Sequence, residues 1–229
     1  MVTFTIDGKE CKAEKGKTVV QAAKDNHVFI PVLCDFEGLP PAATCRLCNV
    51  KINGKPTTAC TTPVAEGMEI ECDTEELNEK RKMIIEMLFV EGNHFCPSCE
   101  KSGNCELQAY AYKYQMMAPR FSYQFTRKDV DASTPKLVIE KNRCILCRRC
   151  VRGIRTEDDK ALFTFVNRGD KAEIFLDRDQ AMNISDELAE KAMDMCPVGA
   201  IIKKEKGFTV PVGQRKFDKK PIGSDIENG

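Results

Sequence analysis

Thirteen cysteines constrain this chain of 229 residues more than any other feature. No basic segment followed by an apolar run opens the sequence, so we expect no secretory signal and a cytoplasmic protein. Disulfides do not persist in that reducing compartment, where clustered thiols more often bind metal. Eleven of the thirteen cysteines fall into three groups, and only two histidines accompany them.

Composition excludes several classes of protein. The 35 basic and 35 acidic side chains cancel, and no nucleic-acid-binding module is evident, so we expect no nucleic-acid partner. The longest apolar run, Met83–Val90, is interrupted by Glu86 and is too short for a transmembrane segment. No G-x-G-x-x-G fingerprint occurs, and no Ser/His/Asp or paired-carboxylate constellation stands out. We therefore expect no catalytic residues and no substrate site in this chain.

Local patterns predict a mixed α+β chain. Val2–Ile6 alternates as a strand does, and Asp7-Gly8 follows as a turn. The clearest helical stripe covers Glu75–Val90, with Asp73 or Thr74 as its N-cap. Further helices are expected over 18–25, 104–114, 150–156 and 186–195, and strands over 47–52, 68–72, 137–140, 161–166 and 173–176. Residues 116–135 should form a connector, and the chain from Val210 an extended tail.

The first group is Cys34-x10-Cys45-x2-Cys48-x11-Cys60. Four thiolates, three near one loop and a fourth further on, are typical of a [2Fe–2S] cluster. Small residues before Cys45 would let backbone amides turn toward the sulfurs. A zinc site with four cysteine ligands is the alternative, although zinc usually takes two short C-x2–4-C pairs and this group has one.

The second group is Cys96-x2-Cys99-x5-Cys105, which needs a fourth ligand. His94 lies two residues before it and is the nearest nitrogen donor. Spacing alone does not separate a zinc knuckle from an iron–sulfur site. Because the other two cysteine groups of the chain are typical of iron–sulfur clusters, a [4Fe–4S] cluster is favoured here as well. His27 is expected to be a loop or packing residue.

The third group is Cys144-x2-Cys147-x2-Cys150, completed by the distant Cys196-Pro197. In two-cluster ferredoxins the fourth cysteine of each run ligates the other cluster. Here the first run has Ile154 in its fourth position, and the second run has three other residues in place of cysteines, namely Asp186, Ala189 and Ala192. The surviving thiols would assemble one complete [4Fe–4S] cluster, and the second cluster is lost.

Five arginines accompany the third group: Arg143, Arg148, Arg149, Arg152 and Arg155. Guanidinium groups beside a negative cluster should favour its reduced form. Docking of an acidic partner is an alternative role. For Arg152 and Arg155 a plain solvated charge is a further interpretation.

Four stretches add to these groups and carry a family resemblance: Thr44-Cys45-Arg46-Leu47-Cys48, Cys96-Pro97-Ser98-Cys99-Glu100-Lys101-Ser102-Gly103, Cys105-Glu106-Leu107-Gln108 and Cys196-Pro197-Val198-Gly199-Ala200. With them the sequence resembles the N-terminal iron–sulfur region of the large electron-transfer subunit of complex I, shared with many [FeFe] hydrogenases. It is most similar to the diaphorase iron–sulfur small subunits of NAD-reducing or electron-bifurcating [NiFe] hydrogenases. Because the sequence continues for only 33 residues after Cys196, we expect it to lack the catalytic domains of the larger relatives.

One departure from the complex I pattern concerns the histidine. Complex I typically has His-x3-Cys, which would place histidine at position 92, where this chain has Gly92. The chain has His-x-Cys instead, and His94 remains the expected ligand.

The resemblance implies a β-grasp [2Fe–2S] ferredoxin domain over 1–76, a small helical His–Cys [4Fe–4S] domain over 77–118 and a ferredoxin-like [4Fe–4S] domain over 119–209, followed by the tail 210–229. It also implies one [2Fe–2S] and two [4Fe–4S] clusters. The implied partners are a flavoprotein carrying FMN and the NAD(H) site, the small and large [NiFe] hydrogenase subunits, and in bifurcating relatives ferredoxin.

We therefore expect an electron-transfer subunit, with catalysis carried out by its partners. The same chain serving an NAD-dependent formate dehydrogenase or another complex I-like assembly is an alternative. A structural zinc scaffold is a more remote one. Cys11 and Cys72 join no group and are expected to be buried structural thiols.

Overall fold

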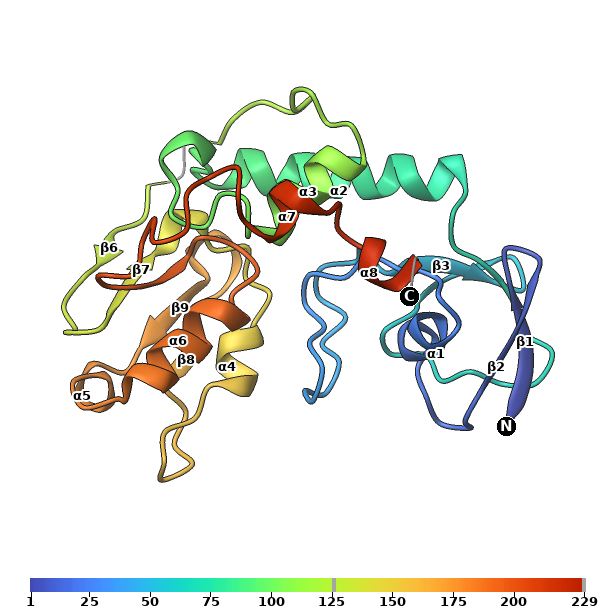
Figure 1. Cartoon of the computed structure of the whole chain (residues 1–229), viewed down its shortest axis with the longest axis horizontal. Coiled ribbons are helices and arrows are strands. Elements are labelled where there is room, and N and C mark those ends of the chain that lie inside the picture. The colour runs from blue at the N-terminus through green and yellow to red at the C-terminus, as the bar shows by residue number, and fades with distance from the viewer. Residues whose placement is uncertain (125–126, 228–229) are drawn as a thin grey trace.

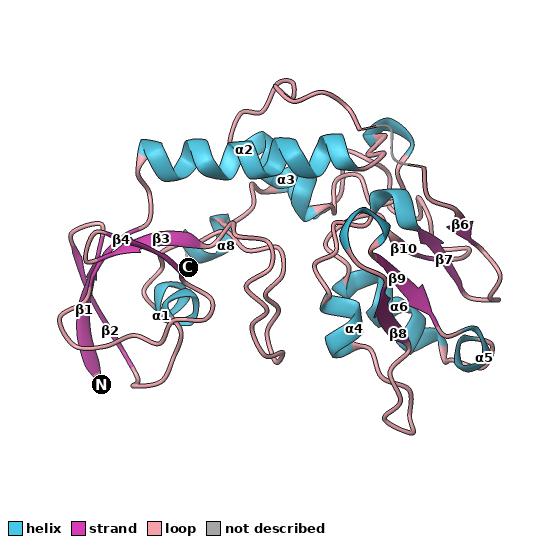
Figure 2. Cartoon of the chain, turned by 180° about the vertical axis from the view of Figure 1, so that it is seen from behind, coloured by secondary structure: helices cyan, strands magenta, loops and turns pink. Residues whose placement is uncertain are grey.

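The computed structural model describes residues 1–124 and 127–227 as a mixed α/β chain. Residues 125–126 and 228–229, which belong to the predicted connector and tail, lie outside the described residues. A sheet with one helix occupies one end of the molecule, a second α/β region occupies the other, and a long helix crosses between them (Figures 1 and 2). Among the described residues, no helix has the length and apolar character to cross a membrane.

The N-terminal region is a five-stranded sheet of order β2-β1-β5-β3-β4. Its strands are β1 Val2–Ile6, β2 Lys9–Ala13, β3 Asn49–Ile52, β4 Lys55–Thr58 and β5 Glu69–Glu71. β1 and β5 pair in parallel, and the other pairs are antiparallel. Helix α1, Val19–Asp25, begins with a capping box between Thr18 and Gln21 and buries Val19, Ala22 and Ala23.

The long helix α2, Glu75–Glu91, begins at its Thr74 cap, whose hydroxyl accepts from the Leu77 amide. Of the two caps predicted, Thr74 is the one used. Arg81 of α2 is buried and donates to three backbone carbonyls of the N-terminal region, those of Leu47, Asn49 and Cys72. The helix is therefore joined to the first sheet through its first half. Helix α3, Glu106–Lys113, packs against α2.

The third region holds two small sheets with helices beside them. Its elements are β6 Val130–Asp131, β7 Leu137–Glu140, α4 Arg149–Gly153, β8 Phe163–Val166, β9 Glu173–Leu176, α5 Arg178–Ala181, α6 Asp186–Met195 and β10 Ile201–Lys203. One sheet has the order β10-β7-β6, and β8 and β9 form the other as an antiparallel hairpin. A continuous apolar core joins this region to α2, α3 and the loop after α1.

Several predicted elements differ from the structure. The helix predicted over 150–156 spans Arg149–Gly153 and ends at Ile154, which leaves helical geometry. The connector contains the short strand β6, and β10 was not predicted because three residues show no alternation. The tail expected to be extended contains two short helices, α7 Lys216–Lys219 and α8 Ser224–Glu227, so that prediction was wrong for them.

Candidate iron–sulfur sites

The four thiols of the first group lie together between α1 and the end of β4. Cys34, Cys48 and Cys60 are buried and Cys45 is partly buried. The Cys34 sulfur takes part in hydrogen bonds with the thiols of Cys45 and Cys60, which lower the pKa of Cys34. The same kind of bond from Cys60 lowers the pKa of Cys48. A set of four adjoining thiols, two of which favour the thiolate, fits the donor set of a [2Fe–2S] cluster.

Backbone amides also turn toward this first site. The Leu33 amide donates to the Cys45 sulfur at 3.4 Å. Ala43 and Arg46 both have positive φ, so the loop around Cys45 coils tightly enough to aim its N–H groups inward. The small residues before Cys45 predict such bonds, and Cys34 receives hydrogen bonds from the Cys45 backbone and the Thr44 side chain.

The second group lines a cavity that His94 shares. Its walls include His94, Cys96, Cys99 and Cys105 together with Gln108. The His94 Nε2 atom is buried, and no hydrogen-bond partner for it lies among the described residues. The imidazole also forms a hydrogen bond with the Leu88 backbone. Because Nε2 is unpaired, this bond is made by the other ring nitrogen, Nδ1. An imidazole held through one nitrogen, with the other unpaired beside a cavity lined by three thiols, is the usual arrangement of a metal-binding histidine.

Burial shifts the pKa values of three members of the second set, His94, Cys96 and Cys105. It lowers the pKa of His94 to about 4, with the nearby Arg143 charge adding to the effect. Burial also raises the pKa of Cys105 to about 12. The Cys105 sulfur caps α3 by accepting from the Gln108 amide at 3.5 Å. The imidazole is therefore neutral at pH 7, the form that can bind a metal.

Gly92 explains why the His-x-Cys spacing can work here. A β-carbon at position 92 would lie 2.6 Å from His94 Nε2 and 2.7 Å from the Asn142 carbonyl oxygen. Real β-carbons do not approach other atoms so closely, so position 92 must be glycine for the imidazole to occupy its place. Gly92, which stands where the complex I spacing has its histidine, thus leaves the space that the His94 ring occupies.

The third group lines a second cavity with an apolar wall. All four predicted ligands contribute to it: Cys144, Cys147, Cys150 and Cys196. Cys150 lies in α4, and Cys196 is the residue after the last turn of α6. Leu146 and Arg148, between the first three thiols, both have positive φ, which coils the loop around the cavity. Burial raises the pKa of Cys144 to about 11.

Apolar residues fill the positions where a second ferredoxin cluster would have its ligands. Ile154, Ala189 and Ala192 are all fully buried in the main core. Asp186 lies at the surface and pairs with Lys136 and Lys203 instead. Packing of these side chains therefore occupies the space that the lost cluster would need.

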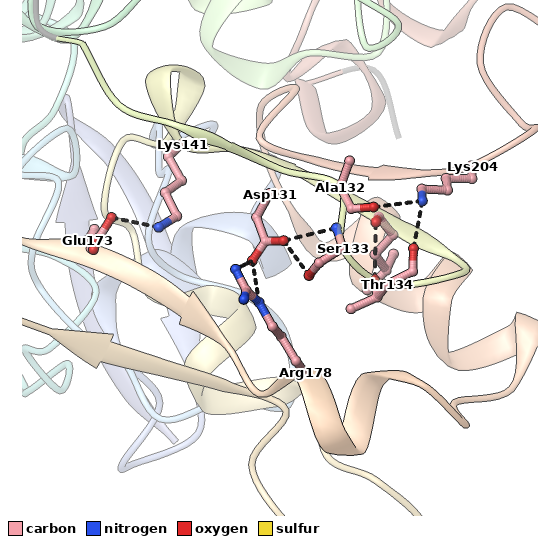
Figure 3. A network of polar contacts seen from close by, with 9 residues as sticks. Asp131, Ala132, Ser133, Thr134, Lys141, Glu173, Arg178 and Lys204 are labelled. Carbon is pink, nitrogen blue, oxygen red and sulfur yellow. Dashed lines mark hydrogen bonds and ion pairs between the residues drawn. The ribbon is translucent and has the colours of Figure 1, made fainter.

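Polar contacts join the strands around the third site (Figure 3). Asp131 of β6 binds Arg178 at 3.4 Å, and Lys204 donates to the carbonyls of Ala132 and Thr134. Lys141 pairs with Glu173 at 2.9 Å, and both residues line the cavity of the third group. These bonds connect β6, β9 and the segments after β7 and β10, and so fix the frame in which the thiols sit.

The five arginines do not share one role. Arg143 pairs with Glu100, and the buried Arg149 makes a two-pronged pair with Glu106. Arg148 lies over the Phe165 ring, 3.9 Å from its centroid. Arg152 donates to the carbonyl oxygens of Cys34 and Pro40, so the interpretation of a solvated charge was wrong for it. Arg155 is exposed.

The segment 197–200 borders both the second and the third site. Val198 and Ala200 line the cavity of the third group, while Gly199 between them lines that of the second. A β-carbon at Gly199 would lie 2.5 Å from the Cys99 sulfur. The Pro197 carbonyl also accepts from the Glu106 amide at 2.8 Å. In the sequence this segment is visible only as part of a motif, and no local signal indicates that it borders two sites.

The first and third sites are also neighbours. Arg152 lies two residues after Cys150 and bonds the Cys34 carbonyl across 118 residues of sequence. A β-carbon on Gly153 would lie 3.0 Å from Leu39 of the same loop. The loop that carries Cys34 extends beside α4 (Figure 1). In space the sites therefore follow the order first, third, second.

The two remaining cysteines are buried away from the three sets. Cys72 donates through its thiol to Asp7 at 2.8 Å, and burial raises its pKa. Cys11 lies in the core of the N-terminal region, where burial raises its pKa as well. Within the described part of the chain, no three His, Cys, Asp or Glu side chains are spaced to hold one metal ion. The second and third sets each line a cavity.

Family models match three successive parts of this chain. Residues 1–75 match a 2Fe-2S iron-sulfur cluster binding domain, and residues 81–120 match the NADH-ubiquinone oxidoreductase-G iron-sulfur binding region. Residues 134–202 match the ferredoxin-like domain of NADH-quinone oxidoreductase subunit 3. The matched regions support the predicted complement of one [2Fe–2S] and two [4Fe–4S] clusters. They give the zinc alternative no support.

A curated relative of nearly the same length decides the family. The gamma subunit of the NAD-reducing hydrogenase HoxS from Cupriavidus necator is 43% identical over 95% of this chain and 93% of its own length. The chain belongs to this family of hydrogenase iron–sulfur subunits. The fold agrees, because a chain in the crystal structure of an NAD+-reducing [NiFe]-hydrogenase in the H2-reduced state superposes with a TM-score of 0.88 at 38% identity, covering 96% of this chain and 94% of that one.

More distant members of the superfamily are much longer. The NADPH-Fe(3+) oxidoreductase alpha subunit of Geobacter sulfurreducens is 32% identical over 91% of this chain, which spans only 25% of that protein. The mitochondrial NADH-ubiquinone oxidoreductase 78 kDa subunit of Candida albicans is 32% identical over 90% of this chain and 29% of its own length. The predicted resemblance to both hydrogenase and complex I subunits is thus confirmed.

Proposed function

We propose that this chain is the iron–sulfur electron-transfer subunit of an NAD-linked [NiFe] hydrogenase. The observation that carries the proposal is the grouping of all twelve expected ligands into three separate sets within one fold that matches a hydrogenase subunit over its length. The ligands are Cys34, Cys45, Cys48 and Cys60 for [2Fe–2S], His94, Cys96, Cys99 and Cys105 for one [4Fe–4S], and Cys144, Cys147, Cys150 and Cys196 for the other.

Three domains form the proposed architecture. A β-grasp ferredoxin domain over 1–76 is supported by the mixed five-stranded sheet packed on α1. A small helical domain over 77–118 comprises α2, α3 and the His–Cys loop between them. A ferredoxin-like domain over 119–209 and the tail 210–229 complete the chain.

Each cluster, when bound, supplies one-electron redox chemistry. The work of this chain is to hold, space and tune the three sites. Two adjoining contacts support a continuous series of sites, the bond from Arg152 to the Cys34 carbonyl and the segment 197–200 between the second and third cavities. Burial keeps water from most of the thiols. Imidazole in place of one thiolate at the second site should raise the potential there, as it does in Rieske centres.

The proposed partners follow from the family. They are a flavoprotein that carries FMN and binds NAD(H), and the small and large [NiFe] hydrogenase subunits, in a cytoplasmic complex without nucleic acid. Ferredoxin is included as a further electron partner of the complex. Oxidation of reduced ferredoxin by the purified complex tests that part separately.

Chemical analysis of anaerobically purified protein tests the cluster content. One [2Fe–2S] and two [4Fe–4S] clusters require about ten irons per chain on the usual stoichiometries. EPR of the reduced protein should show three distinct clusters. A colourless, iron-free preparation would instead favour the zinc scaffold and contradict the proposal.

Affinity purification from native extract tests the assembly. The hydrogenase proposal expects co-purification with a flavoprotein and a nickel-containing subunit pair, with H2-dependent NAD(P) reduction. The superfamily also serves other oxidoreductases, as the NADPH-Fe(3+) oxidoreductase relative illustrates. If a formate dehydrogenase catalytic subunit co-purifies instead, with formate-dependent NAD reduction, the chain is the electron-transfer subunit of that enzyme and the hydrogenase proposal is contradicted.

A further inference from the structure

Lys101 is a buried cation without a carboxylate partner among the described residues. Lys101 is only 6% exposed, and its Nζ donates to the Met193 carbonyl oxygen at 2.7 Å. Two other cations close by are paired, the partly buried Arg143 with Glu100 at 2.9 Å and the buried Arg149 with Glu106 at 2.7 Å. Within the described residues, Lys101 shares its lack of a carboxylate with the buried Arg215, whose guanidinium donates to backbone carbonyls.

A buried ammonium needs a counter-charge. Removing an ion from water costs several kcal/mol unless an opposite charge compensates it. The Met193 carbonyl lies near the end of α6, and a helix C-terminus carries about half a negative charge. That partial charge offsets only part of the charge of the ammonium. A negative group nearby would supply the remaining compensation.

The position of Lys101 identifies that group. Lys101 lies in the loop between the predicted ligands Cys99 and Cys105. A β-carbon at Gly199 would meet both the Cys99 sulfur, at 2.5 Å, and the Lys101 Cβ, at 3.3 Å. The bond to Met193 reaches the helix that delivers Cys196 to the third site. Lys101 thus connects the loop of the second set with the helix of the third.

We propose that Lys101 is a positioning residue that supplies positive charge to the cluster at the second site and fixes its loop against α6. Its ammonium stabilises the more negative, reduced state of that cluster and so raises its potential. The inference rests on the proposed ligand set of His94, Cys96, Cys99 and Cys105. It adds to that set a buried cation whose ammonium, within the described residues, bonds the Met193 carbonyl and none of the four predicted ligand atoms.

Glu100 provides a matched opposite test. Its carboxylate neutralises Arg143, which lines the cavity of the second set. Glu100→Gln removes that negative charge and leaves the Arg143 charge uncompensated. Electrostatics therefore predicts opposite shifts from adjacent residues, a lower potential for Lys101→Met and a higher potential for Glu100→Gln.

The experiment measures all three cluster potentials by EPR redox titration of the anaerobic, cluster-loaded protein. The variants are Lys101→Met, Glu100→Gln and, as a control, Lys191→Met on the exposed face of α6. Iron and sulfide are determined for each. At a fixed solution potential, we expect Lys101→Met to lower the ratio of reduced to oxidised second cluster at least tenfold. For a one-electron couple, a tenfold change corresponds to a midpoint potential about 59 mV lower. The [2Fe–2S] potential and all potentials of Lys191→Met should stay unchanged.

Each result decides the inference. An unchanged second potential in Lys101→Met protein with full iron content overturns it. If Lys101→Met loses the second cluster, Lys101→Arg is measured, and recovery of iron and potential by this charge-retaining variant supports the inference. Iron loss in both variants shows a packing role and overturns it. Wild-type protein with about six irons instead of about ten would overturn the proposed His94 site itself, a different failure.

Discussion

Gly199 lies directly against the sulfur of Cys99, and a β-carbon there would come within 2.5 Å of it. Both residues line the second cavity, although Gly199 lies only three residues after Cys196, a predicted ligand of the third site. This contact places the motif Cys196-Pro197-Val198-Gly199-Ala200 between two cavities, with alternate residues facing each. Glycine is required there because any side chain would displace a predicted ligand of the second cluster.

Gly199→Ala should therefore perturb the second cluster selectively. The added methyl group collides with the Cys99 sulfur, whereas Val198 and Ala200 still line the third site. We expect loss of the second cluster, with iron falling from about ten to about six per chain, and intact EPR signals from the other two. The signals of those two clusters serve as the internal control, and full iron content with three unchanged spectra would contradict the prediction.

His94→Cys should keep the second cluster and lower its potential. The thiolate adds a negative charge where a neutral imidazole now sits, and this disfavours the reduced state. EPR redox titration measures the shift. His27→Ala is a suitable control, since His27 lies in the N-terminal region with no predicted ligand role. An identical titration curve for His94→Cys and wild type would remove His94 from the ligand set.

Arg152→Ala should loosen the contact between the first and third sites. The substitution leaves the carbonyl oxygens of Cys34 and Pro40 without the guanidinium that now binds both. Loss of such bonds costs about 1–3 kcal/mol. Thermal unfolding should shift to lower temperature, and limited proteolysis should cut the loop between Cys34 and Cys45 sooner. Arg155→Ala, at an exposed position of the same region, should behave as wild type.

The C-terminal tail should protect the second cluster. The buried Arg215 donates to the carbonyls of Glu100 and Ser102, at 2.7 and 2.6 Å, and so holds the loop between Cys99 and Cys105. Arg215→Ala removes these bonds while leaving every ligand in place. We expect faster release of iron to a chelator, with the second cluster lost first. Lys219→Ala, which changes an exposed side chain of α7, provides the comparison, and equal release rates for the two variants would exclude this role.

The Cys72 thiol should resist alkylation in the native protein. Burial and the bond to Asp7 raise its pKa above that of an ordinary thiol, so less thiolate is present at any given pH. An unfolded cysteine titrates near pH 8.5. Iodoacetamide at pH 8.5 should therefore modify Cys72 only after unfolding, as peptide mass spectrometry can show. Rapid labelling of native, cluster-loaded protein at Cys72 would argue against the buried arrangement.

Local sequence signals predicted those parts of the fold that depend on neighbours in the chain. The Thr74 cap and the apolar stripe placed α2, and the alternation of Val2–Ile6 placed β1, because both patterns arise within a few residues. β10 and the two tail helices escaped prediction because each has at most four residues. Elements that short form where tertiary contacts hold them, as the bonds of Arg215 hold the start of α7.

Cysteine spacing is a local property, so the sequence alone predicts three groups of ligands and the cluster complement that the family models support. How the three predicted sites lie relative to one another is visible only in the folded chain. The contact from Arg152 to Cys34 spans 118 residues, and the one from Gly199 to Cys99 joins separate regions. Such contacts depend on how whole elements pack, which no local periodicity encodes.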